Sequence, residues 1–229
     1  MFDWFDAMPQ SISTYGGQLD DLLRLIVWIV GPWFVLAEVL LIYFLFRFRK
    51  RDGVRATWLP ADTLKVNAWI LVPCALVLAC DLVIEAASDS VWHEIMIHTP
   101  ENTPPMVRIT GQQYNWTFRY PGADEVFDTS DDIVSIGEMH VPVDEPVRFA
   151  LQAKDVLHAF WVPELRFKQD AVPGRSFDRW FEATRTGRYD IGCAELCGAG
   201  HTLMAAELIV ESRADFNKWI ANNGKVAQR

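Results

Sequence analysis

Several features that would assign a function directly are missing from this sequence. No stretch matches C-x-x-C-H, so the chain carries no covalently attached c-type haem of its own. No internal repeat or low-complexity tract is apparent. Basic residues are in deficit, with 21 Lys and Arg against 30 Asp and Glu and a formal net charge of −9. After position 87 the balance is 21 acidic to 14 basic residues, which argues against a nucleic-acid partner and permits a cationic one.

Cysteine is also scarce, with four in 229 residues. Cys74 and Cys80 lie in an apolar run, where we expect them to act as small apolar residues. The other two lie in "CAELCGAGHTLM", a C-x3-C-x3-H-x2-M array that begins at Cys193. In an oxidising compartment these two could form a disulfide. A disulfide would not account for the histidine and the methionine that follow.

Long apolar runs are present at the N-terminal side of the chain. The run 25–46 would form a helix roughly 33 Å long, enough to cross a bilayer core of about 30 Å. A second run, 66–84, is shorter and contains Asn67, Pro73 and Asp81. The alternative for both runs is a helix buried in a protein core. We interpret them as two membrane spans.

The loop between the runs reads "RFRKRDGVR" and is strongly basic. Because Lys and Arg concentrate on the cytoplasmic side of spans, the sequence predicts a hairpin with both ends outside. No signal peptide is evident, and the acidic start "MFDWFDAMPQ" suits a short translocated tail. We expect an extracytoplasmic tail (1–21), a transmembrane hairpin (22–87) and an extracytoplasmic domain (88–229).

The pattern of the third region predicts β structure. Short β-branched and aromatic segments are separated by Pro, Gly and Asp turns, which favours a β-sandwich or barrel. The segment 213–223 is expected to form a closing helix. The acidic turn 121–132 lacks the EF-hand pattern, and it is either a calcium-binding loop or a solvated hairpin loop.

The donors in the cysteine array are soft or borderline and suit copper. Zinc sites rarely use methionine, and a mononuclear blue-copper site needs only one cysteine. Two thiolates can bridge two copper ions, but a further imidazole would then be needed. The other histidines are His93, His98, His140 and His158. Of these, His158 lies next to a predicted strand, which is a workable position.

At these residues the chain resembles subunit II of cytochrome c oxidase, in the haem–copper oxidase family. The resemblance covers nearly the whole chain and is carried by "GQQYNWTFRY", "DVLHAFWVPELRFKQDAVPGR" and "CAELCGAGHTLM". It implies a membrane-anchored α+β protein, with a two-helix hairpin followed by an all-β cupredoxin domain and a C-terminal helix. It also implies a binuclear CuA centre of two copper ions in that domain.

The resemblance assigns a role to each residue of the array. Cys193 and Cys197 would bridge the two copper ions, and His158 and His201 would be terminal ligands. Met204 would be a weak ligand to one copper ion. The backbone carbonyl of Glu195 would be a weak ligand to the other, and the Glu195 side chain would help to bind magnesium at the interface with subunit I.

The function implied is that of an electron-transfer subunit in a respiratory terminal oxidase, associated with subunit I and other oxidase subunits. It would accept electrons from a separate c-type cytochrome and pass them to haem in subunit I, where oxygen is reduced to water with proton pumping. A bacterial cell membrane is favoured over the mitochondrial inner membrane. Two alternatives are a copper-free scaffold subunit of a quinol oxidase and the CuA domain of nitrous oxide reductase.

Two departures from the family pattern affect these expectations. Where the family usually has the Trp at which electrons arrive, this chain has Tyr114, with Trp116 two residues later. We expect these two aromatics to serve electron input as contact or conduit residues. At the position of the family's second-helix Glu, near a proton path, this chain has Val66, so that role is not transferred. Glu38 and Asp81 are acidic residues within the apolar runs, and an acid inside a membrane span is a candidate functional residue.

Overall fold

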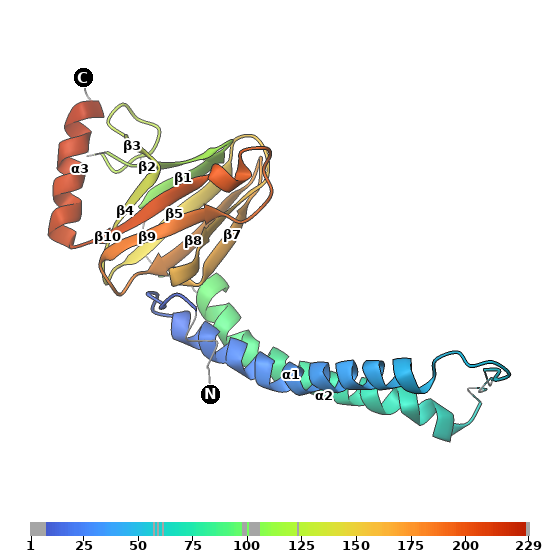
Figure 1. The fold of residues 1–229 in the computed structure, drawn as a ribbon. Helices are drawn as coiled ribbons and strands as arrows, with labels where there is room; N and C mark the ends of the chain where they lie inside the picture. Colours follow the sequence, from blue (N-terminus) through green and yellow to red (C-terminus); the bar gives the residue numbers. More distant parts are fainter. Residues whose placement is uncertain are drawn as a thin grey trace. The chain divides into compact units, whose positions relative to one another are not determined.

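The computed structural model describes residues 8–56, 58, 60, 62–97, 100, 106–122 and 124–227. The chain divides into two compact units (Figure 1). One unit is helical and comprises Gln18–His93. The other contains both sheets and comprises Met1–Gly17 together with Glu94–Arg229.

The helical unit consists of two long apolar helices. The helix α1 (Gly16–Arg47) contains Pro32, and α2 (Leu64–Trp92) contains Pro73. Thr63 caps α2, because its hydroxyl accepts a hydrogen bond from the Val66 amide at 3.4 Å. A short π-helix, η2 (His93–Ile97), continues from α2.

The apolar side chains of both helices face outward rather than into a protein core. The most apolar windows of Gly16–Arg47 and of Leu64–Ile97 have no buried residue, and both are long enough to cross a bilayer. Side chains such as Trp69, which is 83% exposed, require an apolar solvent. The two predicted spans are therefore present as helices, and the chain is a membrane protein.

The second unit is a sandwich of two five-stranded sheets. The first contains, in order, β3 (Ile133–Ile136), β2 (Asn115–Tyr120), β1 (Val107–Gln112), β5 (Pro146–Ala153) and β8 (Ser176–Glu182). The second contains β4 (Glu138–Pro142), β10 (Ala205–Glu211), β9 (Gly187–Cys193), β6 (His158–Val162) and β7 (Phe167–Ala171). The pairs β1–β5 and β4–β10 are parallel and the other pairs are antiparallel.

The core lies between these sheets and follows from the alternation of side chains along each strand. In β1, β2 and β5 every second residue is buried, as expected for strands with one face inward. Phe149 of β5 is fully buried, with ring centroids 6.0, 5.5 and 5.8 Å from those of Phe160, Phe167 and Phe181. The predicted cupredoxin-like β domain is confirmed.

Truncation of this aromatic core should destabilise the β unit strongly. Phe149→Ala is expected to lower the free energy of unfolding by about 3–5 kcal/mol, because it removes a buried ring and leaves a cavity. Thermal unfolding of the full chain, followed by near-UV circular dichroism, measures the loss. Ile136→Ala is the control, since Ile136 is 67% exposed and should cost little. Equal melting temperatures for the two variants would contradict this packing.

The C-terminal helix α3 (Arg213–Ala227) confirms the predicted closing helix. It follows β10 and packs through aromatic residues. The Trp219 ring stacks on the His140 ring, with centroids 4.2 Å apart, and Phe216 is buried. Tyr120 meets Trp219 edge-on at 5.0 Å.

Part of the predicted N-terminal tail is paired with the β unit. Ser13 forms a β-bridge with Ala183. The Ile12 amide donates to the Glu164 carbonyl at 2.8 Å, and the Thr184 amide donates to the Ile12 carbonyl at 2.7 Å. These bonds add an extended segment to the sandwich just before α1 begins.

The acidic turn 121–132 is held by arginines. Asp128 accepts two hydrogen bonds from Arg108, at 2.7 and 2.8 Å. The buried carboxylate of Asp132 accepts from Arg119 at 2.9 Å. The candidate calcium ligands of this turn are its four aspartates, Asp124, Asp128, Asp131 and Asp132. Two of them, Asp128 and Asp132, are paired with guanidinium groups, which favours the solvated hairpin loop over a calcium site.

Candidate metal centre

The cysteine array lies on the connection between β9 and β10. Cys193 ends β9, the turn η4 (His201–Leu203) follows, and Met204 directly precedes β10. Because β9 and β10 pair in an antiparallel ladder, the two ends of the loop are neighbours. The Cys193 amide donates to the Met204 carbonyl at 3.2 Å and closes the loop.

His158 reaches this loop from a distant part of the chain. It is the first residue of β6, and β6 pairs with β9 in a register that sets Phe160 opposite Cys193. The Ala194 amide extends the pairing by donating to the Ala159 carbonyl at 3.0 Å. The sheet therefore fixes the position of the histidine relative to the cysteines.

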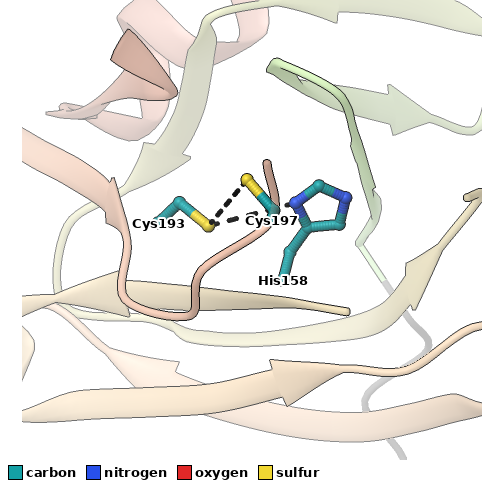
Figure 2. A group of neighbouring side chains, drawn as sticks. All are labelled: His158, Cys193 and Cys197. Atoms are coloured by element: carbon teal, nitrogen blue, oxygen red, sulfur yellow. Dashed lines mark hydrogen bonds between the residues drawn. The ribbon is translucent and has the colours of Figure 1, made fainter. Parts of the chain in front are cut away.

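The donor atoms of these residues converge (Figure 2). The Sγ atoms of Cys193 and Cys197 are 3.9 Å apart, and Cys193 Sγ is 3.9 Å from His158 Nδ1. Cys197 Sγ is 3.7 Å from His201 Nδ1. Bonds of about 2.3 Å to sulfur and 2.0 Å to nitrogen, as in tetrahedral zinc sites, put neighbouring ligand atoms roughly 3.5–3.8 Å apart. The spacing thus suits donors that share metal ions.

Two weaker donors complete the set. Met204 is buried, and its thioether sulfur is 3.8 Å from Cys197 Sγ. The carbonyl oxygen of Glu195 is 3.2 Å from Cys193 Sγ. Each cysteine therefore has one imidazole and one weak donor beside it. Thiolate, imidazole and thioether together suit copper better than zinc.

The two cysteines are free thiols rather than a disulfide. Their sulfur separation of 3.9 Å is far beyond a disulfide bond of about 2.05 Å. Burial and the neighbouring Cys193 raise the pKa of the Cys197 thiol to about 11. The pocket therefore disfavours a lone thiolate, so a positive metal ion is needed to hold Cys197 in its deprotonated form.

Asp155 fixes the orientation of the His158 ring. Its Oδ1 atom lies 2.8 Å from His158 Nε2 and accepts from the Val156 amide at 2.7 Å. Its Oδ2 atom accepts from the Gln113 amide at 2.8 Å. Although desolvation opposes ionisation, these three hydrogen bonds lower the pKa of Asp155 to about 2. An ionised Asp155 keeps the proton on Nε2, so Nδ1 faces the sulfur atoms with its lone pair free.

The turn between β1 and β2 also contacts the cysteine loop. The Gln113 side-chain amide donates to the Cys197 carbonyl at 2.6 Å. Tyr114 is 38% exposed, and its ring covers two glycines of the loop. A Cβ on Gly198 would lie 2.6 Å from the Tyr114 hydroxyl oxygen, and a Cβ on Gly200 would lie 2.6 Å from a ring carbon of Tyr114. This close approach requires glycine at both positions.

Trp116 occupies a different environment from Tyr114. It is fully buried, and its ring meets those of His158 and Phe160 edge-on at 6.0 and 5.4 Å. It cannot contact a partner directly. Of the two aromatics considered for electron input, only Tyr114 reaches the surface, and Trp116 could act only as an internal conduit.

The other histidines that the structure describes are not part of this donor cluster. His140 pairs with Glu211 and stacks on α3, while His93 begins η2. His98 lies outside the described residues. Gln113 was not anticipated from the sequence. Its position beside the aromatic turn was the only signal, because a glutamine side chain is at most a weak metal ligand and has no redox chemistry.

Asp155→Asn should loosen the centre while keeping the side chain's size. If the Asn oxygen stays on His158, its NH2 group faces the Gln113 N–H, donor to donor. If the amide flips, NH2 faces His158 Nε2, and the proton must move to Nδ1, where it blocks metal binding. We expect copper affinity to fall about 10–100-fold.

Chelator competition with the full chain would measure this affinity. Asp170→Asn is the matched control, because Asp170 is half-exposed and pairs with Lys168. Wild-type affinity and an unchanged copper spectrum in Asp155→Asn would show that Asp155 does not position His158.

Comparison with known proteins places the chain among oxidase subunits. Residues 106–212 match the family model described as cytochrome c oxidase subunit II, periplasmic domain. The alternative cytochrome c oxidase subunit 2 of Bradyrhizobium diazoefficiens is 35% identical over 231 residues, covering 91% of this chain and 81% of that protein. Cytochrome c oxidase subunit 2 of Thermostichus vulcanus is 29% identical over 269 residues, covering 96% and 79%. Among solved structures, the periplasmic domain of subunit II of cytochrome oxidase from Bradyrhizobium japonicum matches with 28% identity and a TM-score of 0.49, covering 56% of this chain and 99% of that one.

Proposed function

Because this chain belongs to the cytochrome c oxidase subunit II family, we propose that it is the electron-accepting subunit of a respiratory terminal oxidase. It is a membrane protein with an extracytoplasmic domain and a subunit of an oxidase complex. In the proposed role it accepts electrons from a c-type cytochrome and passes them to haem in subunit I, where oxygen is reduced to water with proton pumping. The observation that carries the proposal is the convergence of two thiols, two imidazoles and a thioether in one cluster, in which His158, Cys197 and Met204 are buried.

The residues of the cluster would hold two copper ions. Cys193 and Cys197 would bridge them, with His158 and His201 as terminal ligands and Met204 and the Glu195 carbonyl as weak ones. When bound, this pair of ions supplies a one-electron carrier whose charge is shared between two metals. The chain's part is to hold the donors rigidly and keep water out, and the buried Met204, His158 and Cys197 serve both purposes.

Tyr114 is the proposed point at which electrons arrive. It is the exposed aromatic nearest in sequence to Gln113, whose side chain donates directly to the Cys197 carbonyl. The peptide bond to Gln113, the Gln113 side chain and one hydrogen bond thus connect Tyr114 to the backbone carbonyl of Cys197. Tyr114 would contact the donor, and the buried Trp116 would support His158 from inside.

The exposed side of the cysteine loop is proposed to face other oxidase subunits. Leu196 and Leu203 are 76% and 80% exposed, which is unusual for leucine in water. The Glu195 carboxylate between the two cysteines makes no hydrogen bond or ion pair with the described residues. It is therefore available to help bind magnesium at the interface with subunit I.

The orientation in the membrane follows the charge of the hairpin loop. With five cations between the spans, the loop would lie in the cytoplasm and the β unit outside it. We propose a bacterial cell membrane rather than a mitochondrial one. The copper-free scaffold role is disfavoured because the complete donor set is retained.

The rate of reduction by cytochrome c should depend on salt. The region after position 87 has 21 acidic and 14 basic residues, so it should attract a donor with a Lys-rich face. We expect the second-order rate to fall at least about tenfold between low and high ionic strength, because the Debye length shortens to about 8 Å at 0.15 M. Stopped-flow reduction of the copper-loaded full chain measures it.

A small neutral reductant is the control, and its rate should not change with salt. If reduction by cytochrome c were equally indifferent to salt, the electrostatic part of the proposal would be wrong. If no reduction occurred at any salt concentration, the proposed donor class itself would be wrong.

A further inference from the structure

The loop between the two spans carries a dense cluster of cations. Over nine residues it presents Arg47, Arg49, Lys50, Arg51 and Arg55, with Asp52 as the one acid among them. These cations line a concavity of about 820 Å³, together with Phe48 and Val54. We call this the basic pocket. It is part of the helical unit and is separate from the metal centre.

The cations of the basic pocket are unpaired among the described residues. Among the described residues, no hydrogen bond or ion pair reaches the side chain of any of the five, and the Arg47 guanidinium lies over the Phe48 ring at 5.2 Å. Cations of the β unit behave differently: Arg108, Arg148 and Arg213 each pair with a carboxylate. The chain has a formal charge of −9, yet no carboxylate of the described residues forms an ion pair with a cation of this pocket.

Large apolar side chains border the same pocket. Phe48 and Val54, which line it, are 67% and 70% exposed. Trp58 does not line the pocket, but it follows the loop closely in sequence and is 86% exposed. The loop follows directly on the end of α1 at Arg47. Aromatic residues at the end of a span lie at the level of lipid headgroups. The orientation of the hairpin in the membrane depends only on how many cations its loop carries. That role therefore does not explain why these cations line a concavity together with apolar side chains.

We propose that the basic pocket binds the headgroup of an anionic phospholipid in the cytoplasmic leaflet. Guanidinium groups bind phosphate oxygens through paired hydrogen bonds, and the lysine adds a point charge. Phe48 and Val54 contact the glycerol and upper acyl region. The volume of about 820 Å³ lies in the range of small-molecule sites, about 300–1,000 Å³. The ligand is held by charge and by apolar contact together, which distinguishes a lipid from a free anion.

The test is lipid binding to the purified full chain in detergent. Phosphatidylglycerol and phosphatidylcholine with identical acyl chains are titrated, and native mass spectrometry counts the bound molecules. The wild type should bind phosphatidylglycerol at least about tenfold more tightly, since each cation near an anionic surface contributes roughly fivefold. Equal binding of the two lipids would overturn the proposal.

The variant for this test is the triple substitution Arg49→Gln, Lys50→Gln and Arg51→Gln. It keeps Arg47 and Arg55, whose charges help to orient the hairpin in the membrane. The three substituted side chains form no hydrogen bond or ion pair with the described residues, so folding should not depend on them. Its preference for phosphatidylglycerol should be lost. The matched control removes three exposed cations of the β unit, Lys168, Arg175 and Lys218, and should bind like the wild type.

Three further outcomes would contradict the proposal. If the triple variant kept its lipid preference, or if the control lost it equally, the site would not be the basic pocket. Glycerol 1-phosphate is added as a competitor to separate the two sources of phosphate. Displacement of the lipid at equimolar glycerol phosphate would mean that the pocket takes a free anion. Retention of the lipid supports the proposal.

Discussion

Cys197→Ser is expected to abolish the proposed binuclear centre, with loss of at least one copper ion per chain. Cys197 Sγ lies 3.9, 3.7 and 3.8 Å from Cys193 Sγ, His201 Nδ1 and Met204 Sδ. A serine oxygen is a hard donor on a shorter bond, so it cannot bridge two soft ions. Since substitutions outside the ligand set already lower metal affinity 10–100-fold, removal of a bridge should lower it more than about 100-fold.

Copper content and the visible spectrum of the purified full chain measure this effect. Cys74→Ser is a matched control, because Cys74 lies in α2, is exposed and is remote in sequence from the array. It should retain full copper content and the wild-type spectrum. Wild-type copper content in Cys197→Ser would remove the bridging role of this residue.

Tyr114→Leu is expected to slow electron input from cytochrome c by at least about tenfold at every ionic strength. Tyrosines at the centre of an interface commonly dominate its binding energy, and the Tyr114 ring also covers the glycines of the ligand loop. The residue contributes no metal donor, so the copper spectrum should be unchanged. Loss of the ring removes the contact while the ligands stay in place.

The control is Tyr114→Phe, which keeps the ring and should transfer electrons at nearly the wild-type rate. Stopped-flow reduction across a salt series separates this effect from steering, since steering changes with salt and contact does not. An unaltered rate in Tyr114→Leu would refute its role. A lowered melting temperature with a normal rate in the folded fraction would make Tyr114 a packing residue.

The array itself could be predicted from local sequence, but its partners could not. Cys193, Cys197, His201 and Met204 lie within twelve residues, and their donor chemistry indicates copper directly. His158 reaches them only through the β6–β9 pairing, which depends on the register of two strands distant in sequence. From the sequence, His158 is distinguished from the other histidines only by its position beside a predicted strand and by the family resemblance.

The alternation of buried residues along β2 predicts the burial of Trp116, but it does not predict the exposure of Tyr114. In β2 every second residue is buried, so Trp116 points inward while Asn115 points outward. Tyr114 precedes the strand, where no alternation applies, and its exposure had to come from the structure. The parallel β1–β5 and β4–β10 pairings and the bridge at Ser13 likewise depend on tertiary contacts.

The acidic turn 121–132, which two arginines hold, shows a second limit of prediction from sequence. Sequence alone presents Asp128 and Asp132 as possible cation ligands. Their partners, Arg108 and Arg119, lie on β1 and β2 and become neighbours only when the first sheet forms. Charge clusters in sequence therefore have to be interpreted together with the cations that the fold brings to them.

We propose that this chain holds two copper ions that share one electron. One experiment tests this proposal most directly. The purified full chain is loaded with copper, its metal-to-protein ratio is measured, and the EPR spectrum of the oxidised form is recorded. We predict two copper ions per chain and, where the hyperfine structure is resolved, the seven-line pattern of one electron shared by two equivalent nuclei. One copper ion per fully loaded chain, or zinc in its place, would contradict the account.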